Sequence, residues 1–363
     1  MSTSAPSFAQ SVWLVTEREI GSKLRSKAFL ISTAILFVIA LAGVLWGGFS
    51  AGGDNRVPVA VTSQTAPVVA DIADAVKVTE VDSADAAREL VRDGDVDAAI
   101  VPGGSEPFGY TVVADESAPG TLLQLLSVTP PVELLTTDGV NWALRYFVSL
   151  GFGLIFFMAA LTFGSTIAQS VVEEKQTRVV ELLISAIPTR ALLAGKVIGN
   201  TVLAMGQIIG LATIAIVGLT VTNQVELLTG LGAPLVWFAV FFLFGFILLA
   251  SLFAAAAAMV SRQEDIGSTT TPLTLLVMAP YFLVIFFNDN PVVLTVMSYV
   301  PFSAPVGMPV RVFLGEAEWW EPLLSLGILL VTCAAAIAVG AKIYENSLLR
   351  MGARVKLAEA LRA

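Results

Sequence analysis

Six apolar runs, each about 20 residues long, dominate the pattern of hydrophobic and polar positions along the chain. An α-helix rises about 1.5 Å per residue, so a run of about 20 apolar residues can cross about 30 Å of hydrocarbon. The pattern therefore predicts an α-helical polytopic membrane protein with six transmembrane helices. These helices are expected over residues 28–48, 143–168, 192–221, 235–260, 266–287 and 323–341.

The fifth run, residues 266–287, contains two prolines, Pro272 and Pro280. Each proline removes a backbone hydrogen bond and is expected to kink a helix. The run is interpreted as one kinked span within the membrane region of residues 143–341, and two re-entrant halves are the alternative.

Residues 49–142, between the first and second spans, have a different composition: they are polar and acidic, with short β-branched runs. Such runs are typical of strands. Between the second and third of these strands, a helix is expected to begin at Asp82 or Ser83 and to end at Gly94. Alternating strands and helices predict a small α/β extracytoplasmic domain inserted between transmembrane helices 1 and 2. Its strands are expected at residues 57–61, 76–81, 96–101 and 110–113.

Three carboxylates of this domain, Asp93, Asp95 and Asp97, surround Gly94. Clustered carboxylates are typical ligands of calcium, but here the glycine lies inside the triplet and no closing glutamate follows. A solvated helix end followed by a turn is the preferred interpretation, and no metal site is predicted.

Lysine and arginine favour the segments that a cytoplasmic N-terminus would place inside, including residues 1–27 and the tail at residues 342–363. The short loop at residues 222–234, which would lie outside, has no basic residue. Both termini are therefore expected in the cytoplasm. A cleaved signal peptide is the alternative for the first run, but that run is longer than usual and five more follow.

Two further segments are expected at the membrane surfaces. In residues 1–27, Trp13, Ile20 and Leu24 recur at helical spacing, which favours an interfacial helix at the inner leaflet; an ordinary basic flank of the first span is the alternative. Residues 300–322 are too rich in proline and glycine to span and too apolar for a free loop. They are predicted to form an outer re-entrant or interfacial segment.

Composition narrows the possible chemistry. Of the residues, 56% are hydrophobic and 13% charged, there is no histidine, and the single cysteine is Cys333. Histidine acid–base chemistry, paired-cysteine metal sites and intrachain disulfides are thereby excluded. The chain also lacks the P-loop pattern, and no charged residue lies in the middle of a predicted span, where ion-coupled carriers commonly need one. Energy for any transport must therefore come from another polypeptide.

The charged segment at residues 170–190 lies between the second and third spans. As a helix continuing from the second span, it would pair Glu174 with Arg178 and Arg178 with Glu181, while an apolar stripe lines its other side. Pro188 would end this helix. A solvated loop is the alternative, although such a loop needs no apolar stripe.

The third span carries small and polar residues with distinct expected roles. Asn200, Thr201 and Gln207 could line a substrate path or hydrogen-bond to a neighbouring helix. The glycines share one helical face and allow close helix approach, either within one subunit or across a dimer contact. These glycines are Gly195, Gly199, Gly206 and Gly210.

The segment after the second span has a distinctive set of residues: Glu173, Glu174, Lys175, Arg178, Glu181, Leu182, Leu183, Pro188, Lys196 and Gly199. With these residues, it resembles the cytoplasmic segment of ABC-2 type transporter permeases, particularly the NatB-like sodium-efflux permease branch. The order of spans and the large outer domain are also similar, so the resemblance covers nearly the whole chain. It implies that residues 170–190 form a coupling helix, and that Glu173, Glu174, Arg178 and Glu181 face an ATP-binding subunit.

The resemblance implies a permease subunit in a bacterial plasma membrane, working with an identical or homologous second permease and two ATP-binding subunits. ATP and magnesium would be used by those partners, and this chain would bind no cofactor, no metal and no nucleic acid. Sodium follows from the branch alone; drugs and lipids are equally open as substrates. A membrane-anchored sensor or assembly factor that binds a ligand through the outer domain is the alternative function, and an ion channel is a third.

Overall fold

A computed structural model describes residues 6–52, 56–104, 108–115, 119–127, 142–177, 179–348, 350 and 355–362. The chain divides into two compact units: a helical one from both ends of the sequence, and a smaller one at residues 47–137. Each unit is described by itself.

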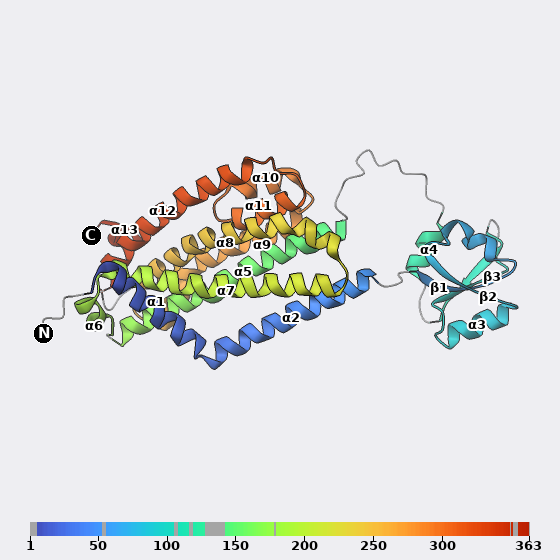
Figure 1. The fold of residues 1–363 in the computed structure, drawn as a ribbon, viewed down its shortest axis with the longest axis horizontal. Coiled ribbons are helices and arrows are strands. Elements are labelled where there is room, and N and C mark those ends of the chain that lie inside the picture. The colour runs from blue at the N-terminus through green and yellow to red at the C-terminus, as the bar shows by residue number, and fades with distance from the viewer. Residues whose placement is uncertain are drawn as a thin grey trace. The chain divides into compact units, whose positions relative to one another are not determined.

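The helical unit contains six helices that are long and apolar enough to cross a membrane, as the sequence predicts (Figure 1). Three have between 33 and 35 residues, which is more than the ~20 residues that about 30 Å of hydrocarbon needs. The fifth continues through Pro272 and Pro280 as one helix, which agrees with a single span. The six are α2 (Lys27–Gly52), α5 (Trp142–Gln176), α7 (Thr189–Val221), α8 (Val225–Ala258), α9 (Ile266–Phe287) and α12 (Glu321–Leu348).

Shorter helices lie near the two ends of this bundle. Helices α1 (Phe8–Leu24), α6 (Val179–Ala186) and α13 (Leu357–Arg362) lie together at one end, called here the α6 end (Figure 1). Helices α10 (Pro291–Tyr299) and α11 (Ala304–Phe313) lie in the opposite half. A 3-10 turn, η2 (Gln263–Asp265), precedes α9.

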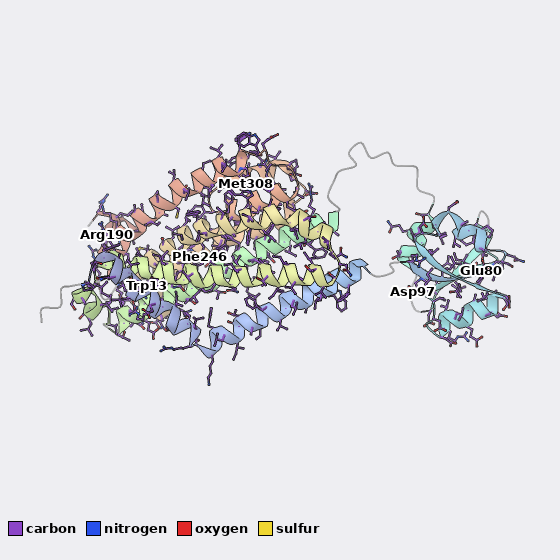
Figure 2. The ribbon with its side chains drawn as sticks, viewed as in Figure 1. Trp13, Glu80, Asp97, Arg190, Phe246 and Met308 are labelled. Carbon is purple, nitrogen blue, oxygen red and sulfur yellow. The ribbon has the colours of Figure 1, made fainter. Side chains whose placement is uncertain are left out.

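Helix α8 is central to the bundle and contacts α5, α7, α9, α11 and α12. Three of its buried phenylalanines, Phe238, Phe242 and Phe246, recur every four residues and meet phenylalanines of α5. Phe238 stacks on Phe152 with ring centroids 4.8 Å apart. Phe246, which Figure 2 labels within the bundle, meets Phe163 edge-on at 5.9 Å. This aromatic seam fixes α5 against the centre of the unit.

The N-terminal helix α1 packs along α7 through its small and polar face. Val15 lies over Gly195, and a Cβ atom added at Gly199 would come within 2.9 Å of the Cβ atom of Glu19. Trp13 points away and is 66% exposed. The predicted helix is present, but of the three apolar residues that indicated it only Ile20 packs against the core, whereas Trp13 and Leu24 are exposed.

We expect Gly195→Leu to destabilise the helical unit by about 1–3 kcal/mol, because the added side chain collides with Val15 and the backbone of α1. Gly206→Leu is the matched control on the same helix, since nothing lies within 4 Å of its added Cβ. Thermal unfolding in detergent should show a lower midpoint for the first variant only. Equal midpoints would show that α1 does not need this close approach.

The segment predicted at residues 300–322 as broken and interfacial is more ordered than the sequence suggested. Two helices, α10 and α11, begin at or near prolines, because proline is tolerated in the first turn of a helix. The helical region therefore starts at Pro291, and α11 is almost wholly buried. Trp319, in the turn before α12, is 80% exposed, which is compatible with a position at a membrane surface.

The smaller unit is a four-stranded sheet in the order β2-β1-β3-β4, in which only β4 is antiparallel to its neighbour. Helix α3 (Ala84–Arg92) covers one face; α4 (Gly120–Leu126) and the 3-10 helix η1 (Ala66–Ile72) cover the other. The predicted α/β character is confirmed. The strands are β1 (Val57–Thr62), β2 (Val76–Val81), β3 (Ala98–Pro102) and β4 (Tyr110–Val113).

Details of this unit refine the expectations. Ser83, rather than Asp82, caps α3, because its side chain accepts a hydrogen bond from the Ala86 amide. Gly94 has a positive φ of 78°, so the chain turns there at the end of α3. Within the described part of the chain, no three carboxylates are grouped to hold a metal ion. Asp97, labelled in Figure 2, lies just before β3.

Candidate functional site

Four charged side chains meet at the α6 end, where α1, α5 and α7 converge; they are called here the ion cluster. Lys196 of α7 lies at its centre, with Nζ 2.9 Å from Oε1 of Glu19 and 3.0 Å from Oε2 of Glu174. Nζ also donates a hydrogen bond to Ser170 of α5 at 2.6 Å. Arg18 donates to both carboxylates. One lysine thus joins three helices.

Three of the four side chains are largely buried, whereas Arg18 is 41% exposed. The side chain of Lys196 is 0% exposed, that of Glu19 is 7% exposed, and that of Glu174 is 13% exposed. Two cations face two carboxylates, as buried charges require. The contact of Lys196 with Oε2 of Glu174 lacks hydrogen-bond alignment, so we treat it as electrostatic.

The electrostatics favour the ionised form of Glu19. Burial by itself would raise the pKa of this carboxyl, but the positive charges of Lys196 and Arg18 outweigh burial. The pKa of Glu19 therefore lies below its ordinary value. The ionised Glu19 thus pairs with Lys196 and Arg18, and the ion pairs of the cluster join α1, α5 and α7.

The segment predicted as a continuous coupling helix is divided in two. Helix α5 ends at Gln176, Thr177 forms a turn, and α6 follows. The predicted pairs through Arg178 lie outside the described residues. Glu174 points inward to the ion cluster, whereas Glu173 and Glu181 are exposed.

Helix α6 ends two residues before Pro188, and α7 begins directly after this proline. The expectation that Pro188 separates the two helices is confirmed. On α6, Leu182 is 74% exposed beside Glu181. A cleft of about 350 Å³ lies next to this helix, between α1 and α5, and is lined mainly by polar side chains. The α6 end therefore presents an apolar side chain and carboxylates to its surroundings.

The glycines of the third span serve packing within the chain at three positions. Gly195 and Gly199 face α1, and Gly210 faces Phe37 of α2. Gly218, which the sequence analysis did not single out, similarly faces Val44 of α2. Gly206 has open space around it. A dimer role is thus unnecessary to explain the other predicted glycines.

The polar residues of α7 take different positions. Asn200 is fully buried and donates to the carbonyl of Lys196 at 2.9 Å. Thr201 donates to the carbonyl of Val197 at 2.7 Å. Gln207 is half-buried. Asn200 and Thr201 thus bond to their own helix, and a substrate path along the three residues stays a prediction.

Sequence reasoning missed the ion cluster because it treated its members as flanking charges. Glu19 and Lys196 are 177 residues apart, so no local pattern pairs them. One signal was present: Lys196 directly follows Gly195, a glycine suited to close helix contact. A lysine at such a contact has little access to water and needs an acidic partner on the neighbouring helix.

Six helices that are long and apolar enough to cross a membrane, tied together at one end by buried charges, define a polytopic membrane protein. A sequence model of the ABC-2 family transporter proteins matches residues 27–342, and the chain belongs to this family. Permeases of this family generally pair with an ATP-binding subunit.

Two uncharacterized proteins are similar to this chain. The uncharacterized protein YhaP of Bacillus subtilis (strain 168) is 25% identical over 398 residues, covering 94% of this chain and 95% of that protein. The uncharacterized protein MJ1024 of Methanocaldococcus jannaschii is 24% identical over 208 residues, covering 57% of this chain and 51% of that protein. No solved structure matches the chain. These similarities identify no substrate.

Proposed function

We propose that this permease is the membrane subunit of an ATP-driven exporter in a bacterial plasma membrane, with its α6 end and both termini in the cytoplasm. It would work beside a second permease, identical or homologous, and two ATP-binding subunits that use ATP and magnesium. The distribution of lysine and arginine along the sequence supports this orientation. The direction of transport, export rather than import, is inferred from the sequence resemblance.

The observation that carries the proposal is the arrangement around α6. Its exposed Val179 and Leu182 lie beside the exposed carboxylate of Glu181, and protein interfaces combine apolar side chains with a polar rim in this way. Immediately before it, the last turn of α5 is bonded to α1 and α7 through Glu174. Movement of a partner against α6 would therefore reach the membrane helices through a short, rigid path.

We expect the double variant Glu181→Lys, Leu182→Asp to reduce co-purification of the ATP-binding subunit at least about tenfold, a loss of about 1.4 kcal/mol. Glu264→Lys is the matched control: it is also an exposed carboxylate, in the turn between α8 and α9. Pull-down from detergent and ATPase activity of the reconstituted complex measure the effect. A double variant that assembles like wild type would contradict the proposed docking surface.

The same reconstituted complex can be used to identify the class of substrate. Sodium rests on the resemblance to the NatB-like branch, so the ATPase rate should be measured with sodium, with lipids and with amphipathic drugs. Stimulation by one class identifies the substrate class. If no ATP-binding subunit co-purifies with the wild-type chain, the membrane-anchored sensor becomes the better interpretation.

A further inference from the structure

Lys175, the residue after Glu174, is bonded to a different part of the bundle. Its side chain is fully buried, and Nζ donates to the carbonyl of Ala258 at 2.8 Å and to that of Ser347 at 2.9 Å. These carbonyls lie at the ends of α8 and α12. No described carboxylate forms an ion pair with it.

Two helix ends take the place of a carboxylate partner. The last carbonyls of a helix lack intrahelical donors, and the helix dipole places about half a negative charge there. Two such ends together offset about one positive charge. The ammonium group has three donors, so it can satisfy both carbonyls at once. Lys175 therefore bridges α5, α8 and α12.

Glu174 and Lys175, two adjacent residues, therefore connect the last turn of α5 to two different sets of helices. Glu174 reaches Arg18 of α1 and Lys196 of α7, whereas Lys175 reaches α8 and α12. The turn that precedes α6 is bonded to four other helices. The aromatic seam joins α5 to α8 along the bundle, but at this last turn the hydrogen bonds to the ends of α8 and α12 come from one side chain.

We propose that Lys175 is a positioning residue for transport: it passes the displacement of α6 and α5 to α8 and α12, so that both sides of the bundle move together. The inference rests on the proposed function, in which an ATP-binding subunit acts on α6. Without this lysine, the ATP-binding subunits still dock and hydrolyse ATP, but α8 and α12 no longer follow α6.

The test uses the full complex and needs no substrate. Amide hydrogen exchange is measured with and without ATP, magnesium and vanadate, for wild type, Lys175→Met and the exposed-lysine control Lys356→Met. Wild type and the control should change exchange in α6 and in the last turns of α8 and α12. Lys175→Met should keep the response of α6 and an ATPase rate within about twofold, while the response of α8 and α12 falls at least fivefold.

A second variant separates positioning from simple loss of stability. Lys175→Arg keeps the charge and the donors, so it should restore the response of α8 and α12. The proposal is overturned if these helices respond in Lys175→Met as in wild type, or if Lys175→Arg behaves like Lys175→Met. A wild-type complex in which α6 itself does not respond to ATP would instead overturn the proposed function.

Discussion

Replacing Lys196 by Met should lower the free energy of unfolding of the helical unit by about 3–5 kcal/mol, because it leaves Glu19 and Glu174 buried without their central cation. Methionine fills a similar volume, so the loss reports the charge rather than a cavity. Arg18 stays beside both carboxylates and is 41% exposed, which places the expected loss near the lower limit. Thermal unfolding in detergent, followed by tryptophan fluorescence, measures it.

The matched control for this variant is Arg190→Met. Arg190 is also a basic residue near the start of α7 and also pairs with a glutamate, Glu345, but its side chain is 70% exposed. Exposed ion pairs contribute little to stability, so the control should unfold close to wild type. If both variants unfold at the same temperature, the buried cluster does not hold the three helices together.

Acid provides a second readout of the same variant. Because the pKa of Glu19 is lowered in the folded chain, this carboxylate adds stability above its ordinary value of 4.5, and that contribution is lost as pH falls through the folded-state pKa. Wild type should therefore lose stability in this acid range. Lys196→Met should show a shallower dependence, since the cation that lowers the pKa is gone. An unchanged acid profile would contradict the assigned cause of the shift.

The spans and the α/β unit could be predicted from the sequence because both depend on local patterns. About 20 consecutive apolar residues suffice to identify a span, and β-branched runs beside a Ser cap and a Gly turn suffice to identify strands and α3. The ends of the long helices were harder to place. The second span was placed at residues 143–168 with a helix continuing from it, and α5 does continue, but only to Gln176.

The site could be predicted only in part. The segment after the second span could be singled out by its charged residues. Its division at Thr177 could not be predicted, because no glycine or proline marks that position. Glu174 was assigned a local partner because helical spacing reports neighbours at three and four residues. Its observed partners, Arg18 and Lys196, belong to other helices, and long-range pairing requires the fold.

The α10–α11 region, in the other half of the bundle, also contains a long-range ion pair that the sequence did not predict. The prolines of residues 300–322 suggested a broken segment, yet this stretch contains α11, and a second buried ion pair fixes α11 and the preceding α10 to the start of α12. Arg311 binds Glu321 in a bidentate manner at 3.1 and 2.8 Å, and their side chains are 7% and 10% exposed. Arg311 also donates to Ser298 of α10 at 3.0 Å, and the hydroxyl of Tyr299 donates to Glu321 at 2.7 Å. One pair thus connects three helices.

Replacing Arg311 by Met should lower the free energy of unfolding of the helical unit by about 3–5 kcal/mol, because Glu321 stays buried without its cation. The loss should appear as faster amide hydrogen exchange across α10 and α11. Arg145→Met is the control: it breaks a more exposed pair, with Glu316, and should change exchange far less. Adding Glu321→Gln to Arg311→Met should recover part of the loss, because no unpaired charge then stays buried. If exchange in α10 and α11 is unchanged in Arg311→Met, packing alone holds these helices, and the ion pair is not what fixes them to α12.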